Sequence, residues 1–208
     1  VTGAGGSIGA ELCRQIAKFR PARLVLFDIS EAALYEIRTA LGDEFTQLPM
    51  VTVVGDVKHA ALVEDVLERE KPNVVFHAAA YKHVPLMEET NAWQAVRNNA
   101  YGTWVIARAS VAAKVEKFVL VSTDKAVNPT SVMGASKRLA EIVCQTLQGG
   151  GTAFVVVRFG NVFGSAGSVI PRFREQIARG GPVTVTHPDI TRYFMSLSEA
   201  TQLLLQAG

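Results

Sequence analysis

Short apolar runs alternate with stretches of helical periodicity along almost the whole of this chain. Five of the runs have the length and apolar composition of buried parallel strands, namely residues 23–27, 51–54, 74–76, 117–121 and 154–157. Between these runs, apolar residues recur every three or four positions, a spacing typical of amphipathic helices. Repeated strand–helix–strand units predict a parallel sheet that helices cover on both faces. The chain is therefore expected to adopt an α/β fold with a doubly wound sheet.

The helices predicted from this periodicity fall at residues 8–19, 33–41, 62–71 and 92–113, and around Lys137. The pattern is less regular after Phe159, where we expect a helix near 170–178, a strand near 183–186 and a final helix from about Ser198. We interpret residues 1–158 as one domain and residues 159–208 as a partial second lobe with interleaved elements. Because almost no strand precedes the first helix, we expect a fragment of a longer protein, trimmed at both ends.

Composition and charge exclude several classes of protein. Hydrophobic residues make up 49% and charged residues 19%, as in an ordinary globular protein rather than a disordered one. The formal net charge is only +2 and the basic residues are scattered, so nucleic acid is not an expected partner. Two lone cysteines, Cys13 and Cys144, indicate reduced thiols in the cytoplasm and have no metal-binding spacing, so no metal is expected. No apolar run approaches the ~18 residues of a membrane span.

A glycine-rich loop, Gly3-Ala4-Gly5-Gly6-Ser7-Ile8-Gly9, stands at the start of the first predicted helix. Glycines three positions apart let the backbone turn tightly, approach a pyrophosphate and pack the helix against the sheet. The helix N-terminus then offers amide hydrogens and a positive dipole end to the phosphates. Taken alone, the loop is also compatible with an ordinary strand-to-helix turn. Within the alternating pattern it predicts a Rossmann-like dinucleotide-binding domain.

Asp28 strengthens this interpretation, because it ends a predicted strand 19 residues beyond Gly9 (28 − 9 = 19). A carboxylate at this place can accept hydrogen bonds from the adenosine ribose hydroxyls, and it would repel a 2′-phosphate. Neither Ile29 nor Ser30 supplies a compensating cation. The alternative role for Asp28 is a helix cap, which Ser30 can provide instead. We therefore expect NAD as the cofactor in preference to NADP.

Other polar and small residues follow predicted strands, so they are expected at the same edge of the sheet. The Asp56-Val57 pair can meet the adenine, although an aspartate that only ends a strand in a turn is equally compatible. The alanine run at 78–80 leaves room where the cofactor would cross, and Lys82 and His83 follow at the mouth of the expected pocket. The expected cofactor-binding residues are Gly3, Gly6, Ser7, Ile8, Gly9, Asp28, Asp56, Val57, Ala78, Ala79, Ala80 and Lys137.

A further helix begins in the stretch Ser-Val-Met-Gly-Ala-Ser-Lys at residues 131–137, where Met133 and Lys137 share one helix face. A tyrosine four positions before this lysine would indicate a short-chain dehydrogenase/reductase. Methionine stands there instead and cannot exchange a proton with a sugar hydroxyl. Lys137 is interpreted as orienting the nicotinamide ribose, with a surface lysine beside Glu141 as the alternative. Met133 is expected to contribute packing.

Just upstream, Thr123, Asp124 and Lys125 place a hydroxyl, an acid and a base side by side after a predicted strand. They stand where cofactor and substrate are expected to meet, and the alternative is a solvated charge pair in a turn before Pro129. The expected catalytic residues are therefore Thr123, Asp124, Lys125 and Lys137. Cations and polar groups that a nucleotide-sugar diphosphate needs follow the strand predicted at residues 154–157, namely Arg158, Asn161, Ser165, Ser168, Arg172 and Arg192. The expected substrate-binding residues are Lys82, His83, Met133, Asn161, Arg172 and Arg192.

The run VSTDKAVNPTSVMGASKRLAE, at residues 121–141, resembles the polysaccharide-biosynthesis family of nucleotide-sugar 4,6-dehydratases, within the extended short-chain dehydrogenase/reductases. VTGAGGSIGAEL, HAAAYKHVPLME, RFGNVFGSAGSVIPRF and residues 182–194 resemble the same family, so the resemblance covers essentially the whole chain. Methionine in place of tyrosine is characteristic of the long, membrane-anchored branch, which acts on UDP-N-acetylglucosamine. The resemblance implies an NAD-binding domain at residues 1–158 and a partial nucleotide-sugar-binding lobe at residues 159–208. It also implies a role in capsule, O-antigen or glycan biosynthesis.

This part of the chain is accordingly expected in the cytoplasm, with membrane contact only through segments outside it, at the inner membrane. A UDP-sugar is the expected substrate, and we expect a homo-oligomer. The resemblance implies that C4 loses a proton and a hydride, that a base removes the C5 proton while the C6 hydroxyl leaves as water, and that the hydride returns to C6. In these terms Asp124 protonates the departing hydroxyl and Lys125 removes the C5 proton. Thr123 holds the C4 oxygen, and the Asp124–Lys125 pair is expected to take the C4 proton, directly or through water.

Two other functions stay open. One is a UDP-sugar C4 or C5 epimerase on the same scaffold, although simple C4 epimerases need a tyrosine-like base and Met133 counts against them. The other is a catalytically silent regulator that binds NAD or a nucleotide-sugar. Loss of the tyrosine would suit a regulator, whereas retention of both Asp124 and Lys125 argues against it.

Overall fold

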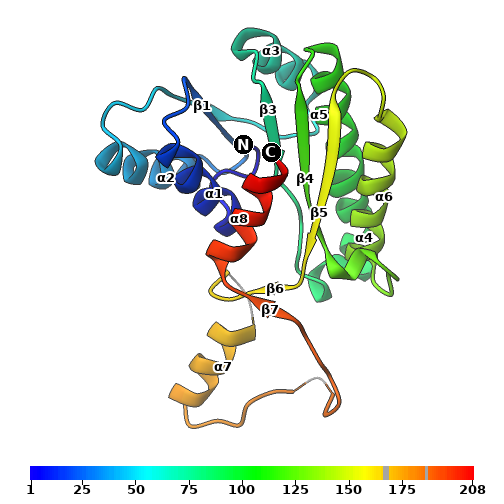
Figure 1. Cartoon of the computed structure of the whole chain (residues 1–208). Helices are drawn as coiled ribbons and strands as arrows, with labels where there is room; N and C mark the ends of the chain where they lie inside the picture. The colour runs from blue at the N-terminus through cyan, green and yellow to red at the C-terminus, as the bar shows by residue number, and fades with distance from the viewer. Residues whose placement is uncertain (166–168, 186) are drawn as a thin grey trace.

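A computed structural model describes residues 1–165, 169–185 and 187–208 (Figure 1). The strands are β1 (Leu24–Asp28), β2 (Met50–Val54), β3 (Val74–His77), β4 (Lys117–Thr123), β5 (Ala153–Phe159), β6 (Asn161–Val162) and β7 (Phe194–Met195). The α-helices are α1 (Ser7–Lys18), α2 (Glu31–Glu44), α3 (Ala60–Glu70), α4 (Ala92–Ala95), α5 (Gly102–Ala112), α6 (Val132–Leu147), α7 (Val169–Ala178) and α8 (Leu197–Ala207). Shorter helical segments are η1 (Pro85–Met87), η2 (Glu89–Asn91), η3 (Val96–Tyr101) and η4 (Asp124–Ala126).

The main sheet is parallel throughout, as the sequence predicts. β1 pairs with β2, and β4 lies between β3 and β5. The first two residues of the chain join these two groups of strands, because Thr2 donates its amide to Phe76 and Val1 accepts from the amide of Phe27. The resulting order is β2, β1, the segment at residues 1–2, β3, β4 and β5. The order in which successive strands are added reverses beside the segment at residues 1–2, as in Rossmann-like folds, so the predicted fold class is confirmed.

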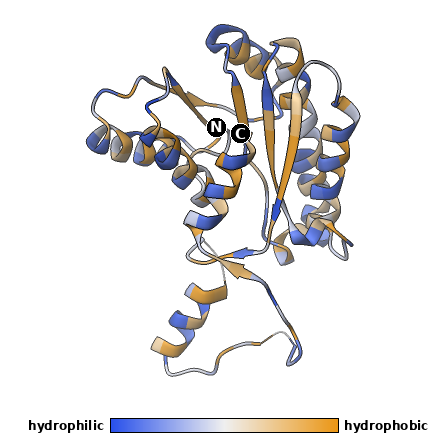
Figure 2. Ribbon diagram, viewed as in Figure 1, coloured by the Kyte–Doolittle hydropathy of each residue, from blue (hydrophilic) through white to orange (hydrophobic). Residues whose placement is uncertain are grey.

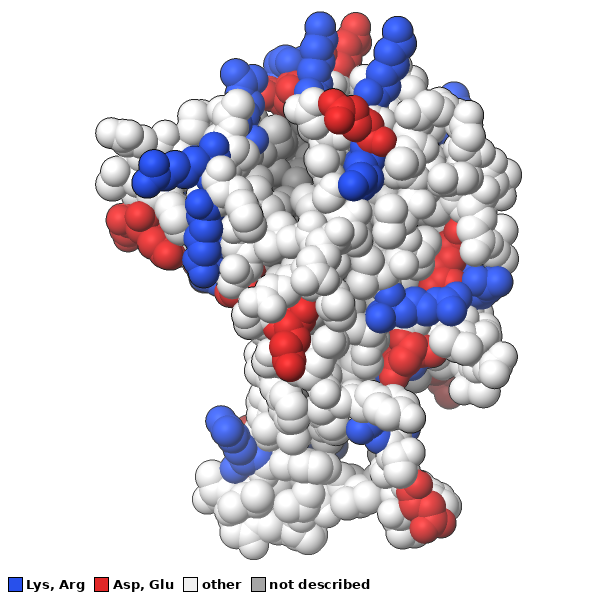
Figure 3. All heavy atoms as spheres, viewed as in Figure 1, with Lys and Arg blue, Asp and Glu red and all other residues white. Residues whose placement is uncertain are grey.

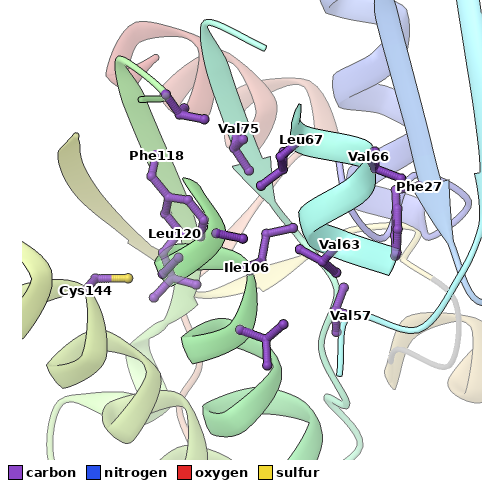
Figure 4. Close-up of a cluster of buried hydrophobic side chains, with 14 of the residues drawn as sticks. Phe27, Val57, Val63, Val66, Leu67, Val75, Ile106, Phe118, Leu120 and Cys144 are labelled. Atoms are coloured by element: carbon purple, nitrogen blue, oxygen red, sulfur yellow. The ribbon is translucent and has the colours of Figure 1, made fainter. Parts of the chain in front are cut away.

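Helices cover both faces of this sheet (Figure 1). Helices α3, α5 and α6 pack together on one face, and α1, α2 and α8 pack on the other. In the largest buried cluster, Phe118 and Leu120 of β4 meet Ile106 of α5 and Val63 of α3 (Figure 4). Each such fully buried side chain contributes about 1.5–3 kcal/mol. Apolar colouring accordingly follows the central strands, while the helices show mixed colouring (Figure 2).

Serine residues start three of the helices. Ser30, Ser131 and Ser196 precede α2, α6 and α8, and each accepts a hydrogen bond from the backbone amide three residues further on. These bonds satisfy amides that have no partner within the helix itself. The side chain of Ser30 caps α2, which leaves the carboxylate of Asp28 available for the cleft at the sheet edge.

The helix predicted for residues 92–113 is confirmed, with an irregularity that the periodicity does not reveal. Between α4 and α5 the chain forms a π-helical segment, η3. Asn98 and Asn99 are buried within it. Such segments are energetically unfavourable and are common at functional sites.

While α8 returns to pack on α1, the elements β6, β7 and α7 form a small lobe below the sheet (Figure 1). Its β6 and β7 pair in parallel, and no side chain described on α7 is buried. The strand predicted near residues 183–186 is wrong for residues 183–185, which form no strand, while Thr186 lies outside the described residues. Thr184 instead exchanges hydrogen bonds with the Gln176 side chain of α7, so its amide needs no strand partner.

No helix in the described part of the chain is long and apolar enough to span a membrane. Acidic and basic side chains are interspersed on the face shown in Figure 3, and neither sign forms a continuous surface there.

Candidate functional site at the carboxyl ends of the strands

The glycine loop passes close beneath the residues that follow β3. Gly3 has a φ of 67°, which favours glycine, and a β-carbon on it would lie 2.6 Å from the amide nitrogen of Ala79. No other residue type would allow the two backbone segments to approach so closely. The loop then enters α1 at Ser7, so the helix N-terminus faces the cleft above the sheet.

Asp28 lies at the end of β1 beside this loop. Its Oδ2 accepts the amide of Gly5 at 2.9 Å, and its Oδ1 accepts the amide of Ser30 at 2.9 Å. The carboxylate borders a cavity of about 310 Å³, here called the Asp28 cavity. Its wall includes the expected cofactor residues Gly3, Gly6, Asp28, Asp56, Val57, Ala78, Ala79 and Ala80.

Asp56 already has a hydrogen-bond partner in the structure, whereas the sequence suggests a carboxylate that is available to the adenine. Its Oδ2 lies 2.8 Å from the ammonium of Lys58, and its Oδ1 accepts the Lys58 amide. Burial opposes ionisation of Asp56, but the hydrogen bonds from Lys58 outweigh it and lower the pKa of the carboxyl. The Lys58 ammonium also donates to Asn98, which lines the same cavity. Asp56 thus presents an ionised and already paired carboxylate.

The residues after β3 connect three cavities. Ala78, Ala80 and Tyr81 border the Asp28 cavity, a cavity of about 650 Å³ at the glycine loop, and one of about 270 Å³ at Lys125. The glycine-loop cavity also takes in Gly3, Gly6, Ser7, Ile8, Gly9, Lys82 and His83. These shared walls make one extended cleft along the sheet edge. The expected cofactor residues therefore come together.

The Tyr81 backbone is held from the π-helical segment. The Asn99 side chain accepts the Tyr81 amide at 2.8 Å and donates to the Tyr81 carbonyl at 2.9 Å. It also donates to the hydroxyl of Ser136 on α6. One buried amide thus fixes the loop that carries Lys82 and His83. Asn99 is not among the residues predicted from the sequence, although two adjacent asparagines within a helical pattern are an unusual signal.

The third cavity, called the Lys125 cavity, is lined by predicted catalytic and substrate-binding residues. These include Thr123, Lys125, Lys137, Lys82, His83, Met133 and Asn161. Apolar and small residues complete its wall, among them Ile8, Val121, Phe159, Gly160, Val162 and Phe194. Its mixed lining is typical of a small-molecule site.

Lys125 lies at the centre of a hydrogen-bond cluster. Its ammonium donates to Oδ1 of Asp124 at 3.0 Å and to Oδ1 of Asn161 at 3.0 Å. The hydroxyl of Thr123 donates to the same Asp124 oxygen at 2.9 Å. Burial opposes ionisation of Asp124, but the bonds from Lys125 and Thr123 outweigh it and lower the pKa of the carboxyl. Asp124 does not line the cavity, yet its side chain is 34% exposed beside it.

Helix α6 approaches this cluster very closely. A β-carbon on Gly134 would lie 2.4 Å from the carbonyl oxygen of Lys125, so glycine permits the contact. On the same helix, Met133 and Lys137 both line the cavity, and both side chains are buried. Met133 also packs against Met87 and Ala95, which confirms its packing role. Burial lowers the pKa of Lys137 to about 8, and the nearby carboxylate of Glu141 limits the fall. The surface alternative for Lys137 is therefore wrong.

Several predicted substrate residues lie elsewhere. Arg172 on α7 and Arg192 before β7 are exposed and do not line the Lys125 cavity. Arg158 does not line the cavity and forms an ion pair with Glu141. Ser165 does line the cavity, while Ser168 lies outside the described residues. Within the described ranges, no three His, Cys, Asp or Glu side chains gather as a metal site would require.

The fold and the joined cavities define a Rossmann-like α/β domain with a continuous cleft at the carboxyl ends of its strands. The family model described as "Polysaccharide biosynthesis protein" matches residues 1–208, and the chain belongs to that family. It is 53% identical over 211 residues to the capsular polysaccharide biosynthesis protein CapD of Staphylococcus aureus. The match covers all of this chain and 35% of CapD, so the chain spans about a third of that relative's length.

A second relative is a UDP-glucose 4-epimerase of Rickettsia rickettsii, which is 34% identical over 219 residues. That match covers all of this chain and 61% of the epimerase. Among solved structures, a double mutant of DesIV, a dTDP-glucose 4,6-dehydratase of Streptomyces venezuelae with NAD and DAU bound, is similar with a TM-score of 0.86. The similarity covers all of this chain and 71% of DesIV at 23% identity, so it concerns the fold.

Proposed function

We propose that this chain is the core of an NAD-dependent UDP-N-acetylglucosamine 4,6-dehydratase that forms a UDP-4-keto-6-deoxy-sugar for capsule, O-antigen or glycan biosynthesis. The observation that carries the proposal is the contact of the Lys125 ammonium with both Asp124 and Asn161 at the wall of the Lys125 cavity. Elimination of water from a sugar needs a base at C5 and an acid at the C6 hydroxyl. An amine and a carboxyl 3.0 Å apart can supply both.

The cleft suits a dinucleotide cofactor. Gly3 keeps the loop free of a side chain that would fill the cradle, and the N-terminus of α1 faces the place for a pyrophosphate. Asp28 would hold the adenosine ribose hydroxyls and would repel a 2′-phosphate, which favours NAD over NADP. Lys137, at the other end of the cleft, would hold the nicotinamide ribose. When bound, the nicotinamide would accept the C4 hydride and return it at C6.

The remaining chemistry falls to side chains of the Lys125 cavity. Thr123 would hold the C4 oxygen, and the Asp124–Lys125 pair would take the proton from the C4 hydroxyl, directly or through water. The C4 proton would pass on to solvent, which leaves the Lys125 amine free to remove the C5 proton, while Asp124 would give a proton to the departing C6 hydroxyl. The Lys125 ammonium would return a proton to C5 as the hydride arrives at C6. Met133 supplies no proton at this site and would pack against the sugar.

The Asp124–Lys125 hydrogen bond also suggests how both groups acquire the right protonation state. The carboxylate of Asp124 is ionised and lies beside the ammonium of Lys125. A bound sugar that excludes water would remove solvation from both charges and favour the neutral forms. One proton moved along the hydrogen bond then gives an amine that can act as a base and a carboxylic acid that can act as an acid.

A nucleotide-sugar epimerase is the second candidate, because the Rickettsia relative carries that name and matches the whole chain. Met133 argues against it, since it replaces the side chain expected to exchange a proton with the C4 hydroxyl. A silent regulator is disfavoured by the Lys125 contacts, because a regulator has no need of an amine hydrogen-bonded to a carboxylate within a cavity.

Two further proposals concern the location and the assembly of the full-length protein. We propose that this domain lies in the cytoplasm and that segments outside it anchor the full-length protein at the inner membrane. We also propose a homo-oligomer. Trp104 of α5 and Leu139 and Ile142 of α6 expose apolar side chains, a feature that supports self-association.

The test incubates the full-length protein with UDP-N-acetylglucosamine and NAD. A 4-keto-6-deoxy product, with one solvent-derived deuterium at C5 in heavy water, is expected. A product that differs from the substrate only in the configuration at C4 would identify an epimerase. No change in the sugar, together with tight binding of NAD, would identify a regulator.

A further inference from the structure

Glu141 is a buried carboxylate for which the proposed chemistry has no use. It lies on α6 one turn after Lys137, and its side chain is 1% exposed. Four donors surround its two oxygens. Ser122 donates to Oε1 at 2.6 Å, Nε of Arg158 donates to Oε1 at 2.8 Å, Nη2 of Arg158 donates to Oε2 at 2.5 Å, and Arg138 donates to Oε2 at 2.9 Å. A charge so deeply buried persists only when it is paired and hydrogen-bonded in this way.

Glu141 and its partners belong to three of the elements that contribute to the wall of the Lys125 cavity. Ser122 is in β4, directly before Thr123, Asp124 and Lys125. Arg158 is in β5, three residues before Asn161. Glu141 itself is in α6, the helix that carries Lys137. The Glu141 carboxylate thus links β4, which leads into Asp124 and Lys125, to β5, which leads to Asn161, the second hydrogen-bond partner of Lys125.

The four donors are not equivalent. The hydroxyl of Ser122 approaches Glu141 from the cavity side, because Ser122 is itself part of the cavity wall. Arg138 approaches from its own helix, and its side chain is 38% exposed. Removal of either donor leaves the carboxylate with Arg158. Only the bond from Ser122 connects it to the backbone next to Asp124 and Lys125.

We propose that Glu141 is a positioning residue, which acts through Ser122 and Arg158 to hold the Asp124–Lys125 pair against Asn161. This inference rests on the proposed function only for its kinetic readout. Without the carboxylate, the end of β4 would gain freedom, and the 3.0 Å contacts of Lys125 would be populated for less time.

The experiment compares Ser122→Ala with Arg138→Met in the full-length protein, because each removes one donor to the same carboxylate. For Ser122→Ala we expect about a tenfold fall in kcat, corresponding to one lost hydrogen bond to a charged group. KM and the NAD dissociation constant should stay within about twofold of their original values, since Ser122 lines neither the Asp28 cavity nor the cavity at the glycine loop. Arg138→Met should change none of these quantities by more than about twofold. A role confined to stability would affect the melting temperature of both variants and kcat of neither.

Hydrogen exchange provides a readout that needs no turnover. Backbone amides of residues 122–126 should exchange several times faster in Ser122→Ala than in the unchanged protein or in Arg138→Met. If the unchanged protein has no dehydratase activity, the proposed function fails while this comparison still decides the inference. Equal exchange in all three proteins would overturn it.

A double variant separates action through Glu141 from direct contact of Ser122 with the sugar. In a Glu141→Gln background, Ser122→Ala should cost less than about twofold further in kcat, because the two residues act as one unit. Independent tenfold losses that multiply would show that Ser122 acts on the substrate by itself and would contradict the proposal. If Glu141→Gln does not fold, the comparison of Ser122→Ala with Arg138→Met stands alone.

Discussion

The ammonium of Lys125 lies 3.0 Å from Oδ1 of Asp124, the residue directly before it in the chain. Consecutive side chains of a strand point to opposite faces, so neighbours in β4 could not make this contact. The chain leaves the strand at Thr123 and forms the short helical turn Asp124–Ala126, which brings the two side chains together. An acid and a base that are adjacent in sequence thus become one hydrogen-bonded pair.

Removal of the amine should abolish turnover without loss of the cofactor. For Lys125→Met we expect kcat to fall by at least about a thousandfold, since the base at C5 is lost, while NAD binds within about twofold. Asp124→Asn should give a similar loss, because an amide cannot protonate the departing hydroxyl. Steady-state kinetics and titration calorimetry measure the two effects. Lys18→Met, at an exposed lysine on α1, is the matched control. Lys125→Met with more than a tenth of normal kcat would refute the role.

The Asp28 carboxylate should set the choice between the two nicotinamide cofactors. We expect Asp28→Asn to weaken NAD binding by about tenfold, because a charged acceptor for the ribose hydroxyls is lost. NADP binding should strengthen, because the repulsion of its 2′-phosphate disappears. Calorimetric titration with both cofactors gives the ratio of the NAD and NADP dissociation constants. Asp43→Asn, at an exposed aspartate on α2, should leave it unchanged. An unchanged ratio in Asp28→Asn would show that another group selects the cofactor.

The buried ammonium of Lys137 should lower the free energy of unfolding of the protein, although the residue serves catalysis. Burial lowers its pKa from 10.5 to about 8 in the folded protein, so the unfolded chain binds more protons between these values. Stability of the unchanged protein should therefore rise as pH increases from about 8 to 10.5. At pH 7 the buried charge costs about 3 kcal/mol, which Lys137→Met should recover as a higher melting temperature together with lost turnover. Denaturant unfolding at pH 7 and pH 10 measures both effects. A Met variant that is less stable at pH 7 would point to an unrecognised partner of the ammonium.

His77 should make the fold sensitive to acid. It is fully buried in β3 between the hydroxyls of Thr2 and Thr103. Thr103 donates its own proton to the carbonyl of Asn99, so Nε2 of His77 carries a hydrogen and Nδ1 accepts from Thr2.

Burial lowers the pKa of His77 from 6.5 to about 3, so stability should fall as pH decreases from about 6.5 towards 3. Between pH 7.5 and 5 the loss should be about 2 kcal/mol. In urea unfolding at pH 7.5 and pH 5, His77→Gln should be less stable than the unchanged protein at pH 7.5. It should lose less stability than the unchanged protein between the two pH values. Exposed His187→Gln should retain the full slope. A steep slope in both variants would assign the acid sensitivity to other groups.

Strands and most helices follow from local patterns in this sequence. Buried parallel strands are nearly continuous apolar runs, and amphipathic helices repeat every three or four residues, so neither needs tertiary information. The valine-rich stretch near residue 184 has the same appearance as a strand. Its hydrogen bonds go to Gln176 instead, which is a tertiary contact that no local pattern reveals.

The candidate site likewise contains residues that local patterns predict and residues that depend on tertiary contacts. Asp28, the alanine run and Lys125 could be predicted because strand ends converge at one edge of a parallel sheet. The pairing of Lys125 with Asn161 could not, because it depends on how the lobe returns to the sheet. Asn99 and Glu141 act through contacts with distant segments, and their polar side chains alone suggest solvent exposure. The i to i+4 spacing of Lys137 and Glu141 is the one local hint that Glu141 lies on the same side of α6 as Lys137.

The most direct test of the central claim follows the hydrogen on C4 of the substrate. UDP-N-acetylglucosamine that carries deuterium at C4 is incubated with the full-length protein and NAD in ordinary water, and the product is examined by NMR and mass spectrometry. The dehydratase account predicts a 4-keto-6-deoxy sugar with the deuterium on C6 and a hydrogen from solvent at C5. Deuterium that remains on C4, with the C6 hydroxyl intact, would contradict it.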